Sequence, residues 1–369
     1  MNEPIRVLQV IGIMDQGGAE AMIMNLYRYI DRSRVQFDFV ENENDGAYFD
    51  EEIESLGGKI YHCPRFTGKN LLAYKKWWKK FFDTHKEYLA VHGHIGSTAA
   101  FYLKEAKKHG LTTIAHSHNT SVKNRKQFFY DVLSFPTRSI ADHLFMCSKQ
   151  AGTDRYGAEA VQQKGHLFPN AVDTKLFRYD EKTRKNKRKE LGISDNSFLV
   201  GHIGRFAEQK NHLFLLDIFK EIVSLHPDSV LLLVGDGELR QQIEAKIKTL
   251  NLEGKVVLLG LRSDVNELLM AMDVLVFPSK YEGLPVTLVE AQCSGLPCVI
   301  SDKVPSDSIL IKELIQVCSL ADSSSEWAEI ALLKKDIGRS SCAEKIREAG
   351  FDVESNAKWL EDFYCEQAK

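Results

Sequence analysis

The sequence predicts an α/β protein made of two tandem domains, each built around a parallel sheet. The 369 residues are 44% hydrophobic and 27% charged, as in ordinary globular proteins, and the length suits two domains at roughly 150 residues each. Short apolar and β-branched runs alternate with amphipathic stretches long enough for helices, which is typical of strand–helix–strand units. A highly charged stretch over residues 179–196 interrupts this alternation before it restarts.

The expected elements follow this alternation along the chain. Strands are expected in the first half over residues 6–13, 35–40, 59–63, 88–94, 112–116 and 143–147, with helices over 18–31, 71–86 and 97–109. In the second half they are expected over 198–203, 229–234, 255–259, 273–277 and 297–301, again with helices between them. The last segment, near residues 353–364, is predicted to be a helix.

These elements define four parts of the chain. We expect a Rossmann-like domain over residues 1–178, a charged linker with room for one short helix over 179–196, and a second Rossmann-like domain over 197–350. The C-terminal helix, residues 351–369, is expected to return to the first domain. Since ligands of open α/β sheets bind beyond the carboxyl ends of the strands, we expect the site in a central cleft between the domains.

Several classes of protein are excluded by composition. No apolar run approaches the roughly 18 residues of a membrane-spanning helix, and the segment Met1–Pro4 leads into a strand pattern without a signal-peptide layout. We therefore expect a cytoplasmic protein. The seven cysteines are scattered and form no C-x-x-C pair, which argues against a disulfide framework or a thiolate zinc site.

The net charge of −3 hides a basic block, because residues 59–149 contain 16 Lys and Arg against 5 Asp and Glu. Within it, the stretch 71–82 combines lysines with aromatic residues at helical spacing, and residues 123–129 form a second basic and aromatic stretch. Such stretches suit peripheral contact with the anionic inner face of a cell membrane. A helix packed on the sheet explains the same spacing, and both interpretations stay open. Nucleic acid is not expected, since no recognised binding motif accompanies the charge.

Two loops after predicted strands have features of phosphate sites. Gly17 and Gly18 begin a helix and expose backbone N–H groups that suit a phosphate or a closely approaching sugar, although a tight turn explains them equally well. In the second half, Arg205 and Lys210 flank a short loop that opens a helix, so two cations and a helix N-terminus can converge on one diphosphate. Taken alone, such a pair is usually surface charge.

Two carboxylates follow the predicted strand 273–277. Glu282 belongs to a loop and Glu290 to the next helix, in an E-x7-E spacing that lets both face one cleft. Carboxylates accept hydrogen bonds from vicinal hydroxyls, which ribose and hexoses present. The alternative interpretation is that Glu282 caps the helix and that Glu290 faces solvent on it. No D-x-D or P-loop pattern occurs, and the glycines near residues 235–237 lack the third member of a dinucleotide fingerprint.

Together these stretches resemble glycosyltransferase family four, retaining sugar-nucleotide enzymes with the two-domain GT-B fold, and in particular its branch for bacterial capsules and exopolysaccharides. Six motifs in the family's order span nearly the whole chain: residues 17–20, 116–119, 169–173, 204–211, 234–237 and 282–297. The resemblance implies that Arg205 and Lys210 bind the donor diphosphate, with the backbone of Gly283, Leu284 and Pro285 nearby. It also implies that Glu290 holds the ribose, Glu282 the sugar hydroxyls, and the region of Leu261 and Arg262 the base.

In the first domain, the resemblance implies that Gly17, Gly18 and His118 face the donor sugar and the acceptor. His116 and His118 alternate, so on a strand their side chains point to the same side. We favour His118 as the family's active-site histidine, and we place His94 and His116 with it as candidate acceptor-side residues.

The function implied is transfer of a hexose from a nucleotide diphosphate donor, most simply a UDP-sugar, to a saccharide or lipid-linked oligosaccharide, with retention. The catalytic set would be His118, Arg205, Lys210 and Glu282, with no metal or other cofactor, because cations and amides neutralise the leaving diphosphate. Two alternatives remain: a sugar-nucleotide epimerase of similar architecture and a non-catalytic nucleotide-sugar sensor.

Overall fold

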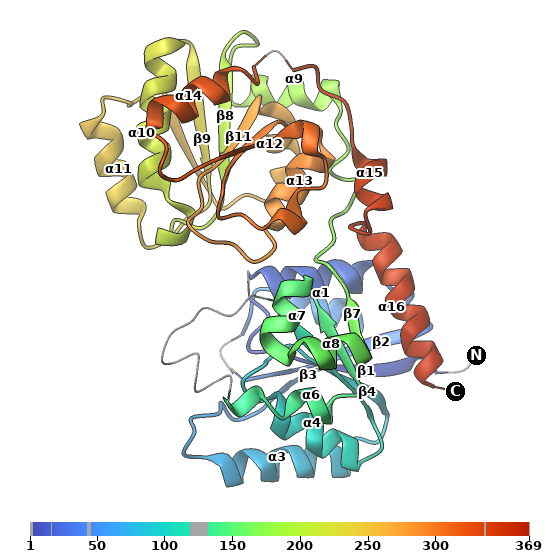
Figure 1. The fold of residues 1–369 in the computed structure, drawn as a ribbon. Helices are drawn as coiled ribbons and strands as arrows, with labels where there is room; N and C mark the ends of the chain where they lie inside the picture. Colours follow the sequence, from blue (N-terminus) through green and yellow to red (C-terminus); the bar gives the residue numbers. More distant parts are fainter. Residues whose placement is uncertain (1–2, 16, 43–45, 119–131, 336, 369) are drawn as a thin grey trace. The chain divides into compact units, whose positions relative to one another are not determined.

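The structure is a computed structural model that describes the chain except for residues 1–2, 16, 43–45, 119–131, 336 and 369. Two compact units make up the chain (Figure 1). The first consists of Met1–Ala171 with Val353–Lys369, and the second is Val172–Asp352. Each unit has its own parallel sheet, which confirms the predicted two-domain α/β architecture.

The sheet of the first unit has the strand order β3-β2-β1-β4-β5-β6-β7, and all neighbours are parallel. Its strands are β1 (Ile5–Val10), β2 (Val35–Glu41), β3 (Ile60–His62), β4 (Tyr88–Gly93), β5 (Thr112–Ser117), β6 (His143–Met146) and β7 (Gly165–Leu167). Its described helices are α1 (Gly18–Tyr29), α2 (Asp50–Ser55), α3 (Leu71–Thr84), α4 (Ala99–Lys108), α6 (Thr137–Ile140), α7 (Lys149–Tyr156), α8 (Ala158–Lys164) and α16 (Val353–Gln367). The sequence did not predict β7, because this edge strand has three residues and only one large apolar side chain.

Both faces of this sheet are buried. Val7 belongs to an apolar cluster that includes residues of α1 and α16, whereas the next residue, Leu8, belongs to a cluster that includes residues of α3 and α4. Successive side chains of a strand point to opposite faces, so covering both faces requires nearly continuous apolar strands. This is why the strands of the first half stand out in the sequence.

The second unit repeats this design with the strand order β10-β9-β8-β11-β12-β13, again with parallel neighbours. Its strands are β8 (Phe198–Ile203), β9 (Ser229–Val234), β10 (Val256–Gly260), β11 (Val274–Phe277), β12 (Cys298–Ser301) and β13 (Ile315–Cys318). Its helices are α9 (Glu181–Glu190), α10 (His212–Leu225), α11 (Arg240–Thr249), α12 (Val265–Ala271), α13 (Val286–Cys293), α14 (Ser324–Leu332) and α15 (Ala343–Glu348), with short 3-10 turns η1 (Glu208–Lys210), η2 (Ser306–Ser308) and η3 (Lys312–Leu314). The edge strand β13 was not predicted, since its two middle residues are exposed.

The prediction of a charged linker over residues 179–196 is wrong. This stretch forms α9, which packs on α12 within the second unit, and the boundary between the units lies at residues 171 and 172. Lys187 has only 5% of its side chain exposed and pairs with Asp264 at 2.7 Å. Arg188 is fully buried and donates to the Ala271 carbonyl at 2.9 Å. The charges of α9 therefore attach it to its unit.

The C-terminal helix α16 returns to the first unit, as predicted. It packs against α1 and β2 (Figure 1). Its buried residues Leu360, Phe363 and Tyr364 join the same apolar cluster as Val7. The chain thus crosses from the first unit to the second and comes back.

The aromatic residues of α3 point into the protein. Tyr74, Trp78, Phe81 and Phe82 are buried and pack on the sheet, which is the arrangement of an ordinary amphipathic helix. The interpretation in which these aromatic residues reach a membrane is therefore wrong, although the lysines of the same helix stay exposed. The second stretch, residues 123–129, lies outside the described residues. None of the helices that the structure describes is long and apolar enough to cross a bilayer.

Candidate active site

The loop between β8 and α10 presents the two cations singled out in the sequence. β8 ends at Ile203, and Arg205 follows with 75% of its side chain exposed and an ion pair to Glu238 at 3.3 Å. Lys210 ends the 3-10 turn η1, and Asn211, in the left-handed conformation with φ of 57°, leads into α10. Both cations are thus placed at the carboxyl end of a central strand, where ligands of such sheets bind.

Lys210 is paired with one of the two predicted carboxylates. Its Nζ lies 2.7 Å from Glu282 Oε1, and only 17% and 6% of the two side chains are exposed. Gln209 Nε2 donates to the other oxygen of Glu282 at 3.1 Å, and the Lys210 ammonium lies 4.7 Å from the centre of the Phe277 ring. The fold therefore brings the loops after β8 and β11 together and holds a lysine–glutamate pair in a largely buried position.

Glycines let the neighbouring loops approach closely. Gly235, after β9, has φ of 131°, and a Cβ there would collide with the Gly204 carbonyl. The Gly235 N–H donates to the carbonyl of Gly260, the last residue of β10, at 2.8 Å. The loops after β8, β9 and β10 are therefore packed against each other, and this is what the glycines near 235–237 provide in place of a dinucleotide fingerprint.

The residues Gly283, Leu284 and Pro285 lie directly before α13, so the first N–H groups of this eight-residue helix follow the predicted phosphate segment. Glu290 belongs to α13 and is partly exposed. Desolvation by burial raises the pKa of Glu290 to about 7. At neutral pH this carboxyl group is therefore poised between its neutral and ionised forms.

Arg262 has other partners than the sequence analysis expected. Its guanidinium donates to both oxygens of Asp264, at 2.7 and 2.6 Å, and lies 3.6 Å from Glu190. These bonds tie the loop after β10 to α9 and α12. Leu261 beside it is exposed and offers an apolar surface. A base-binding role for this region stays a prediction.

In the first unit, the predicted residues also follow neighbouring strands. Gly17 and Gly18 begin α1 after β1, His94 follows β4, and His118 follows β5. These three strands are adjacent in the sheet. A Cβ at Gly17 would collide with the Glu20 carboxylate, whereas the space around Gly18 is open. His94 Nδ1 lies 2.8 Å from His118 Nε2, so these two candidates are in direct contact.

His116 and His118 lie on the same side of the sheet, as their alternation predicts, and their rings stack with centres 4.1 Å apart. His116 is buried in the sheet, so it is not placed to contact an acceptor directly. His118 lies just beyond the strand and is partly exposed. The sequence analysis missed His92, also buried, whose Nε2 lies 3.2 Å from His116 Nδ1. The paired patterns His-Gly-His (92–94) and His-Ser-His (116–118) on adjacent strands were the signal that could have revealed it.

Burial keeps these four imidazoles neutral. Desolvation lowers the pKa of His92 to about 3 and that of His118 to about 4. Desolvation, followed by the neighbouring histidines, lowers the pKa values of His94 and His116 well below 6.5. His118 is therefore suited to accept or share a hydrogen bond at neutral pH as an uncharged ring.

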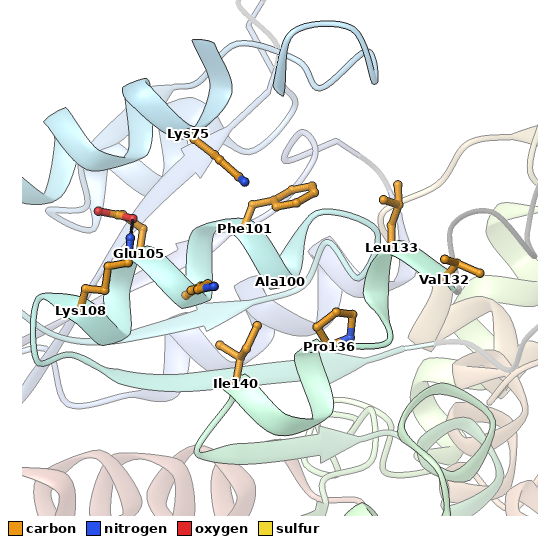
Figure 2. Close-up of a pocket in the computed structure, with 10 residues that line it drawn as sticks. Lys75, Ala100, Phe101, Glu105, Lys108, Val132, Leu133, Pro136 and Ile140 are labelled. Atoms are coloured by element: carbon orange, nitrogen blue, oxygen red, sulfur yellow. Dashed lines mark hydrogen bonds and ion pairs between the residues drawn. The ribbon is translucent and has the colours of Figure 1, made fainter. Parts of the chain in front are cut away.

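A groove of about 360 Å³ lies between α3, α4 and α6 in the first unit (Figure 2). Lys75 of α3 points toward Phe101 of α4, with its Nζ 5.3 Å from the ring centre. Lys104 and Lys108 add two further cations, and Leu133, Pro136 and Ile140 line the opposite, apolar side. The groove thus combines cations with apolar side chains beside the exposed lysines of α3.

Comparison with known proteins identifies the family. The protein-family model "Glycosyltransferase Family 4" matches residues 16–176, and the family model "Glycosyl transferases group 1" matches residues 183–347. The chain is 36% identical over 369 residues to "Putative glycosyltransferase EpsF" of Bacillus subtilis (strain 168), covering 97% of this chain and 96% of that protein. The chain belongs to glycosyltransferase family four. It is therefore a glycosyltransferase.

Other members and structures resemble this glycosyltransferase along most of its length. It is 30% identical over 322 residues to the UDP-Gal:alpha-D-GlcNAc-diphosphoundecaprenol alpha-1,3-galactosyltransferase of Escherichia coli, covering 81% of this chain and 79% of that one. Anabaena Alr3699/HepE, solved in complex with UDP, superposes with a TM-score of 0.81 at 19% identity, covering 98% of this chain and all of that one. WaaG, a glycosyltransferase involved in lipopolysaccharide biosynthesis, gives a TM-score of 0.68 at 17% identity, with 97% and 95% covered. The fold is thus the GT-B fold of this family.

The raised pKa of Glu290, together with the ribose-binding role that the sequence analysis predicts for it, predicts a pH dependence of donor binding. An ionised carboxylate accepts hydrogen bonds from ribose hydroxyls and a protonated one does so poorly, so affinity should rise with pH through about 7. Between pH 6 and 8 the ionised fraction of a group with this pKa grows about tenfold, and we expect up to that change in Kd. Calorimetric titration with a UDP-sugar at each pH measures this change in Kd. A UDP-sugar is suitable because it has no terminal phosphate that titrates in this pH range.

The variant Glu290→Gln is the control, and its donor affinity should be nearly independent of pH. A folded-state pKa above the ordinary value means that stability is lost as pH rises from about 4.3 toward 7. Glu290→Gln should therefore raise Tm more at pH 8 than at pH 5. Equal pH profiles for the two proteins would contradict the assignment of ribose binding to Glu290.

Proposed function

We propose that this glycosyltransferase moves a hexose from a UDP-sugar to a lipid-linked saccharide in bacterial polysaccharide synthesis, with retention of the anomeric configuration. The observation that supports this most is the convergence of Arg205, Lys210 and the start of α13 at the carboxyl edge of the second sheet. Cations and helix N–H groups at one edge suit a diphosphate. The name of the E. coli relative, with its UDP-galactose donor and diphosphoundecaprenol acceptor, favours the same classes of substrate.

In the proposed mechanism, the bond between the anomeric carbon and the diphosphate breaks while the acceptor hydroxyl attacks from the same face. The leaving oxygens take up negative charge, and Arg205, Lys210 and the N–H groups that begin α13 stabilise it. The diphosphate accepts the acceptor's proton, so no protein base is required at that step. Because these groups supply the positive charge, we expect turnover that does not depend on added Mg²⁺ or Mn²⁺.

Lys210 has to change partners in this mechanism. In the structure its ammonium pairs with Glu282 at 2.7 Å. When the donor binds, the ammonium is shared with or transferred to the diphosphate, and Glu282 becomes available to accept bonds from sugar hydroxyls. The pair thus keeps both groups ordered before the donor arrives, which reduces the entropy cost of binding.

The decisive experiment incubates the purified protein with UDP- and GDP-sugars, with and without a membrane extract that contains lipid-linked saccharides. Release of UDP that requires the extract is the expected result, and NMR of the product should show the anomeric configuration of the donor. An isomerised donor sugar without acceptor would favour an epimerase instead. Donor binding with no turnover under any condition would favour a sensor.

We also propose peripheral contact with an anionic bilayer through the exposed lysines of α3 and the groove beside them. Lys75, Lys76 and Lys80 are exposed on one helix, and each lysine near an anionic surface contributes about 1 kcal/mol. The triple change of these residues to Glu should reduce sedimentation with phosphatidylglycerol vesicles by at least about tenfold at low salt. The same change at Lys182, Lys185 and Lys189, exposed on α9, is the matched control.

Salt provides the second readout, because added NaCl screens such contacts and should abolish wild-type binding. Equal sedimentation with neutral and anionic vesicles, or equal losses in the two triple variants, would contradict this membrane contact.

A further inference from the structure

The four histidines of the first sheet form a connected cluster that the transferase mechanism does not use. His92 belongs to β4 and His94 directly follows this strand, while His116 belongs to β5 and His118 directly follows it. The rings of His92 and His94 stack with centres 4.6 Å apart, and those of His92 and His116 lie 5.3 Å apart. The proposed mechanism gives none of these four imidazoles a step, so the cluster remains to be explained.

The spacing of their nitrogens is close to that of metal ligands. One ring nitrogen from each of His92, His94 and His116 lies within 4.8 Å of the others, the one such group among the described residues. His92 Nε2 and His116 Nδ1 are 3.2 Å apart. Two nitrogens bound to one tetrahedral zinc ion at about 2.0–2.1 Å are separated by about 3.4 Å. Small side-chain adjustments would therefore bring all three onto one ion.

A cavity of about 10 Å³ lies at the same place. Its polar lining comes from Gln9, His92, His94 and His116, and the rest of its wall is apolar. A volume of this size is about that of a single water molecule or ion.

The hydrogen bonds around the cluster match those of metal-bound histidines. Metal-bound histidines usually bond through their second ring nitrogen to another protein group, which fixes the ring. His92 Nδ1 lies 2.6 Å from the Tyr364 hydroxyl, and His94 Nδ1 lies 2.8 Å from His118 Nε2.

We infer that His92, His94 and His116 form a binding site for a zinc-class divalent ion, with a water or Gln9 Oε1 as the fourth ligand. Imidazole ligands select such ions over Mg²⁺, which prefers oxygen. The three ligands lie at the ends of the neighbouring strands β4 and β5 of the first unit, with His94 just beyond β4, whereas the predicted diphosphate residues belong to the second unit. The ion would therefore hold two strands and, through Tyr364, α16 together, and would hold His94 against the active-site candidate His118.

Metal content tests this site directly. Tag-free protein would be treated with EDTA, loaded with ZnCl₂, dialysed and assayed by mass spectrometry for zinc per chain. We expect about one zinc per wild-type chain. His116→Asn should bind zinc at least about 10–100-fold more weakly, because even the loss of a residue that only supports a ligand has that effect.

His166→Asn is the matched control. His166 belongs to β7 of the same unit and lies 3.1 Å from His143, so it is also half of a histidine pair but has no third ligand. This variant should keep wild-type zinc content. Zinc should also raise the Tm of the wild type and His166→Asn but not that of His116→Asn, since only ions bound to the folded state stabilise it.

Cobalt keeps the inference testable if His116→Asn fails to fold. Co²⁺ bound to the wild type in a tetrahedral nitrogen site should give intense visible absorption bands, and zinc should displace them. No zinc retained by the wild type, equal retention by a folded His116→Asn, or only the weak spectrum of hydrated Co²⁺ would overturn the site. The cluster would then be a chain of hydrogen-bonded imidazoles around a water. None of these measurements uses donor or acceptor, so their outcome is independent of the proposed transferase reaction.

Discussion

Lys210→Ala is expected to lower turnover by at least about a hundredfold, the effect of removing one preorganised group that stabilises a leaving oxyanion. Its ammonium belongs to a largely buried pair with Glu282, so it has little freedom to lose when it contacts the diphosphate. Steady-state kinetics with saturating UDP-sugar and acceptor measure the loss. UDP affinity should fall as well, because in the proposed mechanism the same charge contacts the bound nucleotide.

This substitution also leaves Glu282 without its cation, and a loss of stability must be separated from a loss of catalysis. The Gln209 amide, 3.1 Å from Glu282, remains as one partner. The double variant Lys210→Ala with Glu282→Gln removes the unpaired charge, so it should recover Tm and leave turnover low. Recovery of turnover in the double variant would show that Lys210 acts only by neutralising Glu282.

Lys280→Ala is the matched control for charge. Lys280 pairs with Glu208 on the surface of the same loops, and its backbone N–H donates to Gln209 at 2.8 Å. Surface pairs contribute at most about 1 kcal/mol, so Tm and turnover should change little. Near-normal turnover in folded Lys210→Ala would contradict the assignment of Lys210 to the diphosphate.

The sheets were predictable because their strands are buried on both faces. A strand such as β8 has all six residues buried, and such runs stand out from their surroundings. The error at α9 has the opposite cause. From composition alone, Lys187 and Arg188 are expected to be exposed to solvent. In the fold, Asp264, Asp273 and backbone carbonyls pair with their charged groups. Only tertiary contacts distinguish a buried, paired charge from one on a linker.

The candidate site was predictable where function depends on position after a strand. Arg205, Lys210 and His118 lie at carboxyl ends, as the alternation of strands and helices implied. The bond between Lys210 and Glu282 joins residues 72 positions apart, and no local pattern encodes that pairing. His92 was missed for a related reason: its neighbours His116 and Tyr364 become neighbours only when β4, β5 and α16 come together.

Arg205→Ala should also lower turnover by at least about a hundredfold. In this variant we expect a loss of catalysis without a loss of stability. With 75% of its side chain exposed and one ion pair, to Glu238 at 3.3 Å, Arg205 contributes little to folding. Tm should therefore stay at the wild-type value while turnover falls. Arg205→Lys should recover part of the rate, because a lysine keeps the charge and loses the planar fork that binds two phosphate oxygens.

Arg240→Ala is the matched control for Arg205, since Arg240 is a partly exposed arginine at the start of α11 with bonds to Asp236 at 3.0 Å and Glu244 at 2.9 Å. The Arg240→Ala variant loses the same charge from the same unit as Arg205→Ala, and it should keep nearly full turnover. If Arg205→Ala and Arg240→Ala lost activity equally, the general positive charge of this unit would attract the donor, and Arg205 would have no specific contact with it. A wild-type rate in Arg205→Ala alone would leave Lys210 and the N-terminus of α13 as the groups that stabilise the leaving diphosphate.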